Sequence, residues 1–319
     1  MIFWIVDRVG YALFQKSKKL GTVKSILIIR RDALGDMLYT LPAIRALAKA
    51  FPDARVTLLA HPHHKELISR EKGINVIFSI GELRERKYDL AIDFKGHIVS
   101  ILLMVFAGAK FRVGYSDIGL GFLLHRVTVR VFNQHIAMQN MKLIQLLGIQ
   151  SELDVSVPVR KSDREQVSQH IKHHTIAVHT DAGVLYKTWP KKNFDELIIW
   201  IQGNFDAHVV TILPGKLDIF ELAAFLEACV LFIGNSSFPG HLAAVMGTPT
   251  ITLFHDGDAE SVWKPIGSIA RVILPDHPIS GRGLGPATRD RMEMISVEKV
   301  KRVVSQTLQD LGVPRKISS

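Results

Sequence analysis

One acidic residue occupies a loop position that is suited to proton transfer. A short apolar stretch ends at Arg30, and the next residues read Arg-Asp-Ala-Leu-Gly-Asp, so that the last of them is Asp36. In a parallel α/β sheet, a loop of this kind lies at the carboxyl ends of the strands, where ligands bind. Asp36 is therefore a candidate general base. Spacing alone leaves a simpler alternative open, in which Asp36 only caps a helix that begins near Leu38.

A second junction between a strand and a helix carries groups that suit an anion. Residues 234–244 read Gly-Asn-Ser-Ser-Phe-Pro-Gly-His-Leu-Ala-Ala. Free amides at a helix N-terminus, with the hydroxyls of Ser236 and Ser237 nearby, are suited to holding a diphosphate. The alternative is an ordinary N-cap with Pro239 in the first turn. A single histidine such as His241 is more often packed and hydrogen-bonded than a ligand.

A lysine in the same half of the chain offers a positive charge for a phosphate. Lys187 comes shortly before the pair Trp189-Pro190, in the loop after a predicted strand at 175–180. It is placed to meet a phosphate at the same sheet edge. The alternative is a solvated lysine beside a buried tryptophan, and spacing does not separate the two.

The elements that must position these residues follow a regular alternation. Short apolar strands alternate with helical stretches, which predicts βαβ units and parallel sheets. The alternation restarts after an irregular stretch near 152–165, so two doubly wound domains with a cleft between them are expected. The predicted strands are 25–30, 54–60, 74–79, 88–94, 175–180, 208–213, 230–234 and 249–254, and the predicted helices are 41–50, 99–109, 135–149, 193–202, 219–228, 240–246 and 296–311.

Length and composition restrict the class of protein. The chain has 319 residues, which favours two domains. Its 40 basic and 30 acidic residues give a net charge of +10, which favours phosphate-bearing or membrane-surface partners. The basic residues are scattered, aromatics are only 8%, and no nucleic-acid-binding motif is present, so no nucleic-acid partner is expected. The single cysteine, Cys229, excludes an internal disulfide and favours a reducing compartment.

The N-terminal segment, residues 1–24, is an amphipathic extension. Its apolar run is too short and too interrupted to span a membrane, which takes about 20 apolar residues, and it lacks the features of a signal peptide. Two interpretations stay open. The segment is a helix lying in a membrane interface, which would make the protein cytoplasmic with peripheral attachment to the inner membrane, or it is a helix packed on the protein's own surface.

Five segments, in this order along residues 25–305, resemble the heptosyltransferase family of GT-B glycosyltransferases, which build the lipopolysaccharide core from ADP-heptose. The resemblance implies an α/β GT-B fold with two Rossmann-like domains facing a central cleft, an acceptor domain at 25–155 and a donor domain at 156–319. The segments are ILIIRRDALGDMLYTLPAIRALAKAFPDARVTLL, YDLAIDFKG, HTDAGVLYKTWP, LFIGNSSFPGHLAAVMGTPTITLF and ISVEKV.

The resemblance also implies a mechanism. It is an inverting transfer, independent of metal or cofactor, from a nucleotide-diphosphate sugar to a hydroxyl of a lipid-linked glycan. In that family the acid of the LGD segment is the general base, which maps onto Asp36 and outweighs the capping alternative. Lys95 is the expected acceptor-binding residue. The expected donor-binding residues are Lys187, Asn235, Ser236, Ser237, Gly240 and His241.

Three departures from the family pattern bear on the donor site. The family usually reads Gly-Asn-Asp-Ser-Gly-Pro-Met-His, so that Ser236 stands at an acid position and Phe238 at a glycine position. We expect Phe238 to keep the backbone from a phosphate and to disfavour a positive φ. The stretch 208–219 lacks the usual extra helix and strand, and LFHDGD at 253–258 replaces the usual turn.

Two other classes of function stand beside the transferase. One is a degenerate family member that binds glycan or a partner protein without transferring sugar. The other is a nucleotide-sugar epimerase or phosphorylase on a similar two-domain fold, for which the LGD and HLAA segments are not expected.

Overall fold

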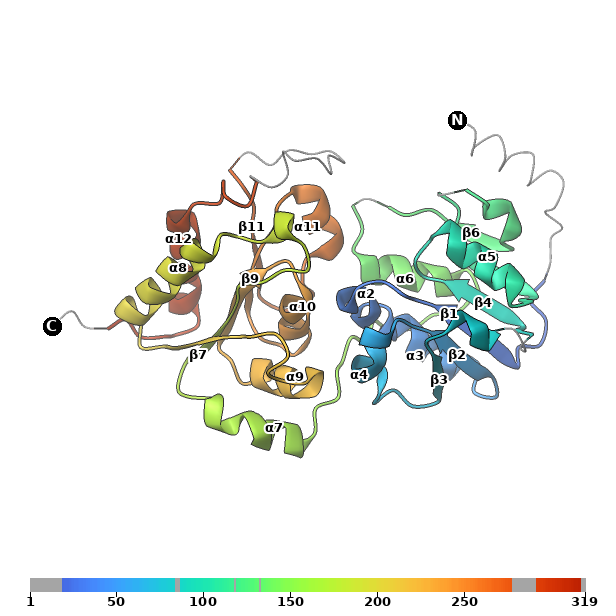
Figure 1. The fold of residues 1–319 in the computed structure, drawn as a ribbon, viewed down its shortest axis with the longest axis horizontal. Coiled ribbons are helices and arrows are strands. Elements are labelled where there is room, and N and C mark those ends of the chain that lie inside the picture. The colour runs from blue at the N-terminus through green and yellow to red at the C-terminus, as the bar shows by residue number, and fades with distance from the viewer. Residues whose placement is uncertain (1–18, 84–86, 118, 132, 277–290, 317–319) are drawn as a thin grey trace. The chain divides into compact units, whose positions relative to one another are not determined.

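The computed structural model describes residues 19–83, 87–117, 119–131, 133–276 and 291–316, and the chain divides into two compact units, Met1–Val155 and Ser156–Ser319 (Figure 1). Of the predicted N-terminal extension, residues 1–18 lie outside the described part. Each unit contains one parallel sheet with helices packed on it. Among the described residues, no helix is long and apolar enough to cross a membrane.

The sheet of unit 1 has six strands, all parallel, in the order β3-β2-β1-β4-β5-β6. Its central strands are almost continuously apolar and buried, as expected for strands covered on both faces. The chain starts in the middle of the sheet, runs outward to β3 and then returns to the other side of β1. The strands are β1 (Ser25–Ile29), β2 (Arg55–Leu59), β3 (Ile74–Ile77), β4 (Leu90–Asp93), β5 (Phe111–Tyr115) and β6 (Arg126–Thr128).

Helices cover both faces of this sheet. One face packs against α5, whose Ile101 and Met104 join a core cluster with Leu27 and Ile29 of β1. On the other, α3 and α6 contact each other. The helices of unit 1 are α2 (Leu34–Leu38), α3 (Leu41–Ala50), α4 (Lys65–Ile68), α5 (Ile98–Phe106) and α6 (Ile136–Gln145), with short 3₁₀ turns at Pro62–His64, Ile80–Leu83 and Gly121–Leu123.

The sheet of unit 2 has five parallel strands in the order β11-β10-β9-β7-β8. Helices α8 and α12 pack on one face around the buried Trp189, and α9 and α10 lie on the other (Figure 1). The elements are α7 (Lys161–Val167), a 3₁₀ turn (Ser168–His170), β7 (Thr175–His179), a second 3₁₀ turn (Leu185–Lys187), α8 (Lys191–Asn204), β8 (His208–Thr211), α9 (Ile219–Glu227), β9 (Leu231–Asn235), α10 (Phe238–Val245), β10 (Thr250–Leu253), α11 (Gly257–Trp263), β11 (Ala270–Ile273) and α12 (Val297–Asp310).

The prediction of two doubly wound parallel sheets is confirmed. Helix 41–50 has the predicted bounds, and β8 runs to α9 without an intervening helix or strand. Some boundaries were wrong: α6 ends at Gln145 rather than 149, and α10 begins at Phe238 rather than 240. Strand β5 was not predicted because Arg112 and Gly114 interrupt its apolar pattern. The Arg112 guanidinium is satisfied by carbonyl oxygens of Leu123 and Ala109, a pairing that local sequence does not reveal.

Candidate functional site

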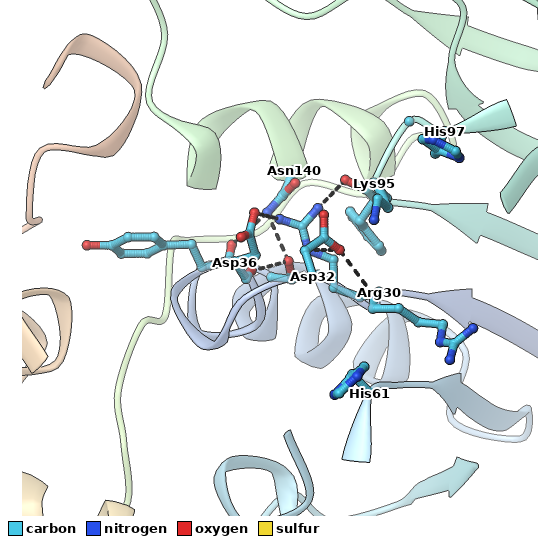
Figure 2. Close-up of polar contacts among 12 residues, drawn as sticks. Arg30, Asp32, Asp36, His61, Lys95, His97 and Asn140 are labelled. Carbon is cyan, nitrogen blue, oxygen red and sulfur yellow. Dashed lines mark hydrogen bonds and ion pairs between the residues drawn. The ribbon is translucent and has the colours of Figure 1, made fainter. Parts of the chain in front are cut away.

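The site in unit 1 begins where the strand order reverses. Strands β1 and β4 are neighbours, but the chain leaves them toward opposite sides of the sheet. In open α/β sheets, ligands bind at this switch point, beyond the carboxyl ends of the strands. The loop after β1 carries Arg30 and Asp32 and leads into α2, which carries Asp36, and the loop after β4 carries Lys95 and His97 (Figure 2).

Arg30 ties the two loops together. Its side chain is only 2% exposed. One guanidinium nitrogen donates to the carbonyl oxygen of Phe94, at the end of β4, and another donates to Asp36 Oδ1 at 2.5 Å. A planar guanidinium can bond two acceptors in fixed directions, which a lysine cannot. Arg30 therefore fixes the Asp36 carboxylate relative to both central strands.

Asp36 lies inside a helix and does not cap one. The first helix after β1 has Ala33 at its N-cap and the next has Thr40, so the capping alternative is wrong. The Asp36 carbonyl oxygen accepts a hydrogen bond from Thr40 Oγ1 at 2.7 Å. The Asp36 side chain is 17% exposed, so its carboxylate reaches the surface. The Thr40 hydroxyl meanwhile fixes the backbone of the same helical turn. This arrangement can accept a proton from a hydroxyl that approaches the sheet edge.

A buried asparagine from another helix supports this turn. Asn140 on α6 is fully buried, and its amide nitrogen donates to the Tyr39 carbonyl oxygen at 2.9 Å and to Thr40 Oγ1 at 3.1 Å (Figure 2). The contact joins residues about a hundred positions apart, and no local pattern in the sequence indicated it. Asn140 thus contributes to positioning Asp36 through Thr40.

Histidines after β2 hold the backbone of the β1 loop. His63 Nε2 and His64 Nε2 lie 2.9 and 2.8 Å from the Asp32 carbonyl oxygen. Burial, above all, lowers the pKa of His64 to about 4. His64 Nδ1 accepts from the His61 backbone amide, so Nε2 carries the proton and donates to Asp32. The sequence signal for this contact is the run His-Pro-His-His at residues 61–64, shortly after a strand, and the contact was not predicted.

The loop after β4 is folded around a buried carboxylate. Asp93 accepts hydrogen bonds from the backbone amides of Lys95, Gly96 and His97 at 2.9, 3.1 and 3.2 Å. Removal from water is the largest effect on this group and raises its pKa to about 6, against the opposing effect of the three amides. Gly96 has φ +65°, and a Cβ there would lie 2.9 Å from the Tyr115 ring. The predicted acceptor residue Lys95 is therefore set on a tightly specified turn, at the same sheet edge as Asp36.

The corresponding switch point of unit 2 lies between β7 and β9. Asn235 ends β9 there, and it was expected to contact the donor. Its side chain is instead fully buried: Oδ1 accepts from the Trp189 amide at 2.9 Å and Nδ2 donates to the Thr180 carbonyl oxygen at 2.7 Å. With both ends of its amide bonded to backbone, Asn235 shapes the site. The donor-contact prediction for this residue is corrected to a positioning role.

The two serines after β9 take different positions. Ser237 is the N-cap residue of α10, but its hydroxyl makes no capping bond and lies 3.2 Å from His179 Nδ1. Ser236 donates its backbone amide to the Leu253 carbonyl oxygen at 3.0 Å. Both residues are half-buried, so their hydroxyls remain at the sheet edge. This is where the sequence placed the diphosphate-binding groups.

Phe238, Gly240 and His241 begin the helix that follows. Phe238 is the first residue of α10 and is not among the described residues with positive φ, so the expected backbone strain is absent and only side-chain bulk remains. A Cβ on Gly240 would lie 3.1 Å from the Phe232 ring, so this buried glycine allows the helix to pack closely on β9. His241 is also buried, 5% exposed, with its ring centroid 6.4 Å from that of Trp263.

Lys187 is carried by a segment that Asn235 anchors. The lysine ends the 3₁₀ turn at Leu185–Lys187, is half-buried, and places Nζ 5.9 Å from the centroid of the Tyr186 ring. Trp189, two residues on, is fully buried and donates its indole N–H to the Ile295 carbonyl oxygen at 2.8 Å. The buried tryptophan is as expected, and the bond between the Trp189 amide and Asn235 brings the Lys187 segment to the β9 loop.

A polar cluster beside this turn was not predicted. His255 Nε2 lies 2.8 Å from Asp256 Oδ2, the Arg291 guanidinium lies 3.9 Å from the same oxygen, and the Tyr186 ring meets His255 edge-on at 5.2 Å. The unusual LFHDGD stretch was its sequence signal. Within the described ranges, no group of three or more His, Cys, Asp and Glu side chains is arranged to hold a metal ion.

Known proteins resemble this chain in sequence and in structure. The lipopolysaccharide heptosyltransferase 3 of Escherichia coli K12 is 25% identical, in an alignment that covers 72% of this chain and 82% of the relative. The E. coli ADP-heptose lipopolysaccharide heptosyltransferase II superposes with a TM-score of 0.68 at 20% identity, over 90% of this chain and 99% of the other. A family 9 glycosyltransferase of Veillonella parvula superposes with a TM-score of 0.71 at 19% identity, over 92% and 100%.

The structural matches establish that the fold is that of the heptosyltransferases, with two Rossmann-like units. The sequence profile of glycosyltransferase family 9 (heptosyltransferase) matches residues 79–209 and 200–279. These ranges span more than half of the 319 residues and include Lys95, Lys187 and the junction after β9. The chain therefore belongs to glycosyltransferase family 9 and is a glycosyltransferase.

Proposed function

We propose that the protein transfers a heptose, with inversion at the anomeric carbon, from ADP-heptose to a hydroxyl of the lipopolysaccharide core or of a related lipid-linked glycan. Membership of the heptosyltransferase family supports the reaction class, and the named relatives support the sugar and the acceptor class. The observation that carries the mechanism is the Asp36 carboxylate, held by Arg30 at the switch point of unit 1.

In the proposed reaction, unit 1 binds the acceptor and unit 2 binds the donor. Asp36 accepts the proton of the acceptor hydroxyl as its oxygen attacks the anomeric carbon. The bond from that carbon to the diphosphate breaks, and ADP leaves from the opposite face of the sugar, which inverts the configuration. Lys95, half-buried like Asp36 and at the same sheet edge, contributes a hydrogen bond or a positive charge to the acceptor.

The charge on the departing diphosphate is met by groups of unit 2. Lys187 supplies a positive charge, Ser236 and Ser237 supply hydroxyls, and the backbone amide of Phe238, the first residue of α10, supplies a donor aligned with the helix dipole. In this proposal neither a metal ion nor a cofactor takes part, because these groups supply the electrostatic stabilisation. Gly240 and His241 are assigned to packing beneath the site.

A second candidate function is supported by two residues at the donor junction. Ser236 stands where the family usually has an acid, and Phe238 stands where it usually has glycine. A member with a weakened donor site would bind glycan or a partner protein without transferring sugar. The two functions differ in donor binding, so calorimetry with ADP-heptose separates them.

Transfer is tested with ADP-heptose and a heptose-deficient lipopolysaccharide core as acceptor, by following ADP release and the mass of the product. Asp36→Asn is expected to lower kcat by about 10²- to 10⁴-fold while the fold is retained. Asp53→Asn, an exposed carboxylate beyond the end of α3, is the matched control and should transfer at the wild-type rate. The anomeric configuration of the product, read by NMR, tests inversion. A folded Asp36→Asn enzyme with wild-type kcat would remove Asp36 from the mechanism.

We also propose a cytoplasmic enzyme that attaches peripherally to the inner membrane through its N-terminal segment. In residues 1–19, apolar residues recur at helical spacing and lysines follow them, which suits an interfacial helix. Deleting 1–19 is expected to weaken sedimentation with anionic vesicles without unfolding the units, because β1 begins only at Ser25. Equal sedimentation of the full-length and shortened chains would refute this attachment.

A further inference from the structure

Helix α5 of unit 1 is apolar on its exposed side as well as on the side that packs against the sheet. Its nine residues, Ile98–Phe106, include no charged side chain. Three of them are buried, Ser100, Ile101 and Met104, and the last two of these pack against the sheet. Most surface helices carry polar residues on the side that faces away from the core. The outer side of α5 therefore needs an explanation other than the folding of unit 1.

The exposed residues of α5 form one continuous stripe. Val99 is 52% exposed, Leu102 48%, Val105 41% and Phe106 57%. At about 100° per residue these four side chains lie within an arc of roughly 120°, opposite the buried side. Apolar side chains scattered singly on a surface are ordinary, but a contiguous stripe marks an interaction site.

The stripe continues past the start of the helix. Arg130 donates to the carbonyl oxygens of Lys95 and Gly96 at 3.3 and 3.4 Å, which brings the end of β6 close to the beginning of α5. The two residues that flank Arg130, Val129 and Val131, are 55% and 38% exposed. The apolar surface is thus extended by residues from a second element.

Positive charge lies at the other end of α5. The chain turns there at Gly108, and the side chain of exposed Lys87 lies 3.7 Å from where a Cβ on that glycine would be. Lys110, whose side chain is 64% exposed, follows two residues later. One acidic group, Asp89, offsets part of this charge through its bond to Lys110. The surface is therefore apolar along the helix and basic at its end.

We propose that this face of unit 1, the α5 face (Val99, Leu102, Val105 and Phe106 with Lys87 and Lys110), docks on an anionic phospholipid surface. The apolar side chains would enter the boundary between head groups and acyl chains, and the cations would meet lipid phosphates. The pairing of an uncharged stripe with flanking cations matches a bilayer interface in both chemistry and layering. The inference deepens the proposed function, in which the acceptor is lipid-linked, and adds a contact independent of residues 1–18.

The test uses the full chain and vesicles that contain neither donor nor acceptor sugar. Sedimentation is measured with phosphatidylglycerol–phosphatidylcholine vesicles and with pure phosphatidylcholine. Leu102→Glu/Phe106→Glu places two negative charges on the stripe and is expected to weaken partitioning onto anionic vesicles by about tenfold or more. The matched control, Ile199→Glu/Leu213→Glu, alters two residues of unit 2 that are 71% and 54% exposed and should partition as wild type does.

A second variant tests the charges alone. Lys87→Glu/Lys110→Gln leaves the stripe intact and should weaken binding to anionic vesicles by a similar factor, with little change on pure phosphatidylcholine. Because the vesicles carry no substrate, this result does not depend on catalysis. An inactive enzyme that still shows these differences would overturn the proposed function and leave the α5 face standing.

Three results would overturn the lipid surface. The first is equal partitioning of wild type and Leu102→Glu/Phe106→Glu, and the second is an equal loss in the Ile199→Glu/Leu213→Glu control. The third is evidence that protein, rather than lipid, covers the face, and it can take two forms. A shift from dimer to monomer in light scattering would assign the face to a second copy, and a fall in Tm of several degrees with unchanged vesicle binding would assign it to the chain's own N-terminal segment.

Discussion

The Arg30 guanidinium donates to Asp36 Oδ1 at 2.5 Å while it also bonds the backbone at the end of the neighbouring strand. One residue thus connects the proposed base to the ends of two strands, because Arg30 directly follows β1 and the carbonyl acceptor Phe94 directly follows β4. A buried ion pair is costly to form, but it is far more costly to break on one side. The geometry of the base is therefore tied to the stability of unit 1.

Replacing Arg30 should affect both stability and catalysis. Arg30→Met leaves the Asp36 carboxylate and the Phe94 carbonyl without this donor and is expected to lower the free energy of unfolding by about 3 kcal/mol. Arg30→Lys keeps the charge but loses the two-pronged geometry, so kcat should fall more than KM changes. Urea unfolding and steady-state kinetics measure the two effects. Arg302→Met, at an exposed arginine of α12, is the control, and a similar loss there would contradict the special role of Arg30.

The buried Asp93 should make unit 1 less stable as the pH rises. Its pKa is raised from 3.8 to about 6 in the folded chain, chiefly because the carboxyl is removed from water. The folded state therefore holds this proton more tightly than the unfolded state, so the contribution is present below about pH 4 and is lost as the pH passes 6. Its size is about 3 kcal/mol at most.

Comparing the free energies of unfolding of wild type and a variant without this carboxyl isolates its effect from those of other carboxyl groups. The difference in free energy of unfolding between wild type and Asp93→Asn, measured in urea from pH 4 to pH 7, should shift against the wild type as the pH rises. A difference that does not depend on pH, or one that shifts in favour of the wild type, would show that folding does not raise the pKa of Asp93.

Asn235 should act on donor binding through the position of the loops. Asn235→Ala leaves the Trp189 amide and the Thr180 carbonyl oxygen unpaired, which should cost about 1–3 kcal/mol of stability for each group that stays buried. ADP-heptose affinity should fall as well, because the Lys187 segment loses its anchor. Asn204→Ala removes one exposed hydrogen bond, from the Asn204 side-chain amide to the Trp200 carbonyl oxygen on α8, and is the control. Wild-type affinity in a destabilised Asn235→Ala protein would show that the hydrogen bonds of Asn235 support the fold but not donor binding.

The bulk of Phe238 should limit donor affinity without abolishing it. Phe238→Gly opens the first turn of α10 to a phosphate and is expected to tighten ADP-heptose binding, whereas Lys187→Ala should weaken it by roughly 10- to 100-fold. Calorimetry measures both, with Lys191→Ala, a 79% exposed lysine side chain on α8, as the control. If neither substitution changes the affinity, the donor site does not lie at this junction.

Local patterns were sufficient for the architecture, and they supplied part of the proposed site. The apolar strands and their alternation with helices predicted two parallel sheets, and the strand-to-helix loops directed attention to Asp36 and Lys187. What was missed depends on contacts between distant segments. The bonds that Arg30 makes to β4, and Asn140 makes to Thr40, join residues 64 and 100 positions apart, and no short motif encodes them.

The error at Asn235 has the same origin. An asparagine beside two serines at a helix start resembles a set of ligand donors, and only the folded chain reveals that its amide is fully used by Trp189 and Thr180. The expected strain at Phe238 failed for a local reason, since α10 begins two residues earlier than predicted and includes Phe238 in helical backbone.

The way Asn235 is bonded has a consequence for how this site can change. The two loops are joined through backbone groups, so their course is independent of which side chains follow on the exposed rim. If the proposed donor site lies here, residues 236–238 can be exchanged to accept a different sugar nucleotide while the bonds of Asn235 beneath them persist. Mutational tolerance should divide sharply there, with Asn235 and Trp189 intolerant and the next three positions permissive, which makes this junction a natural place to redirect donor choice.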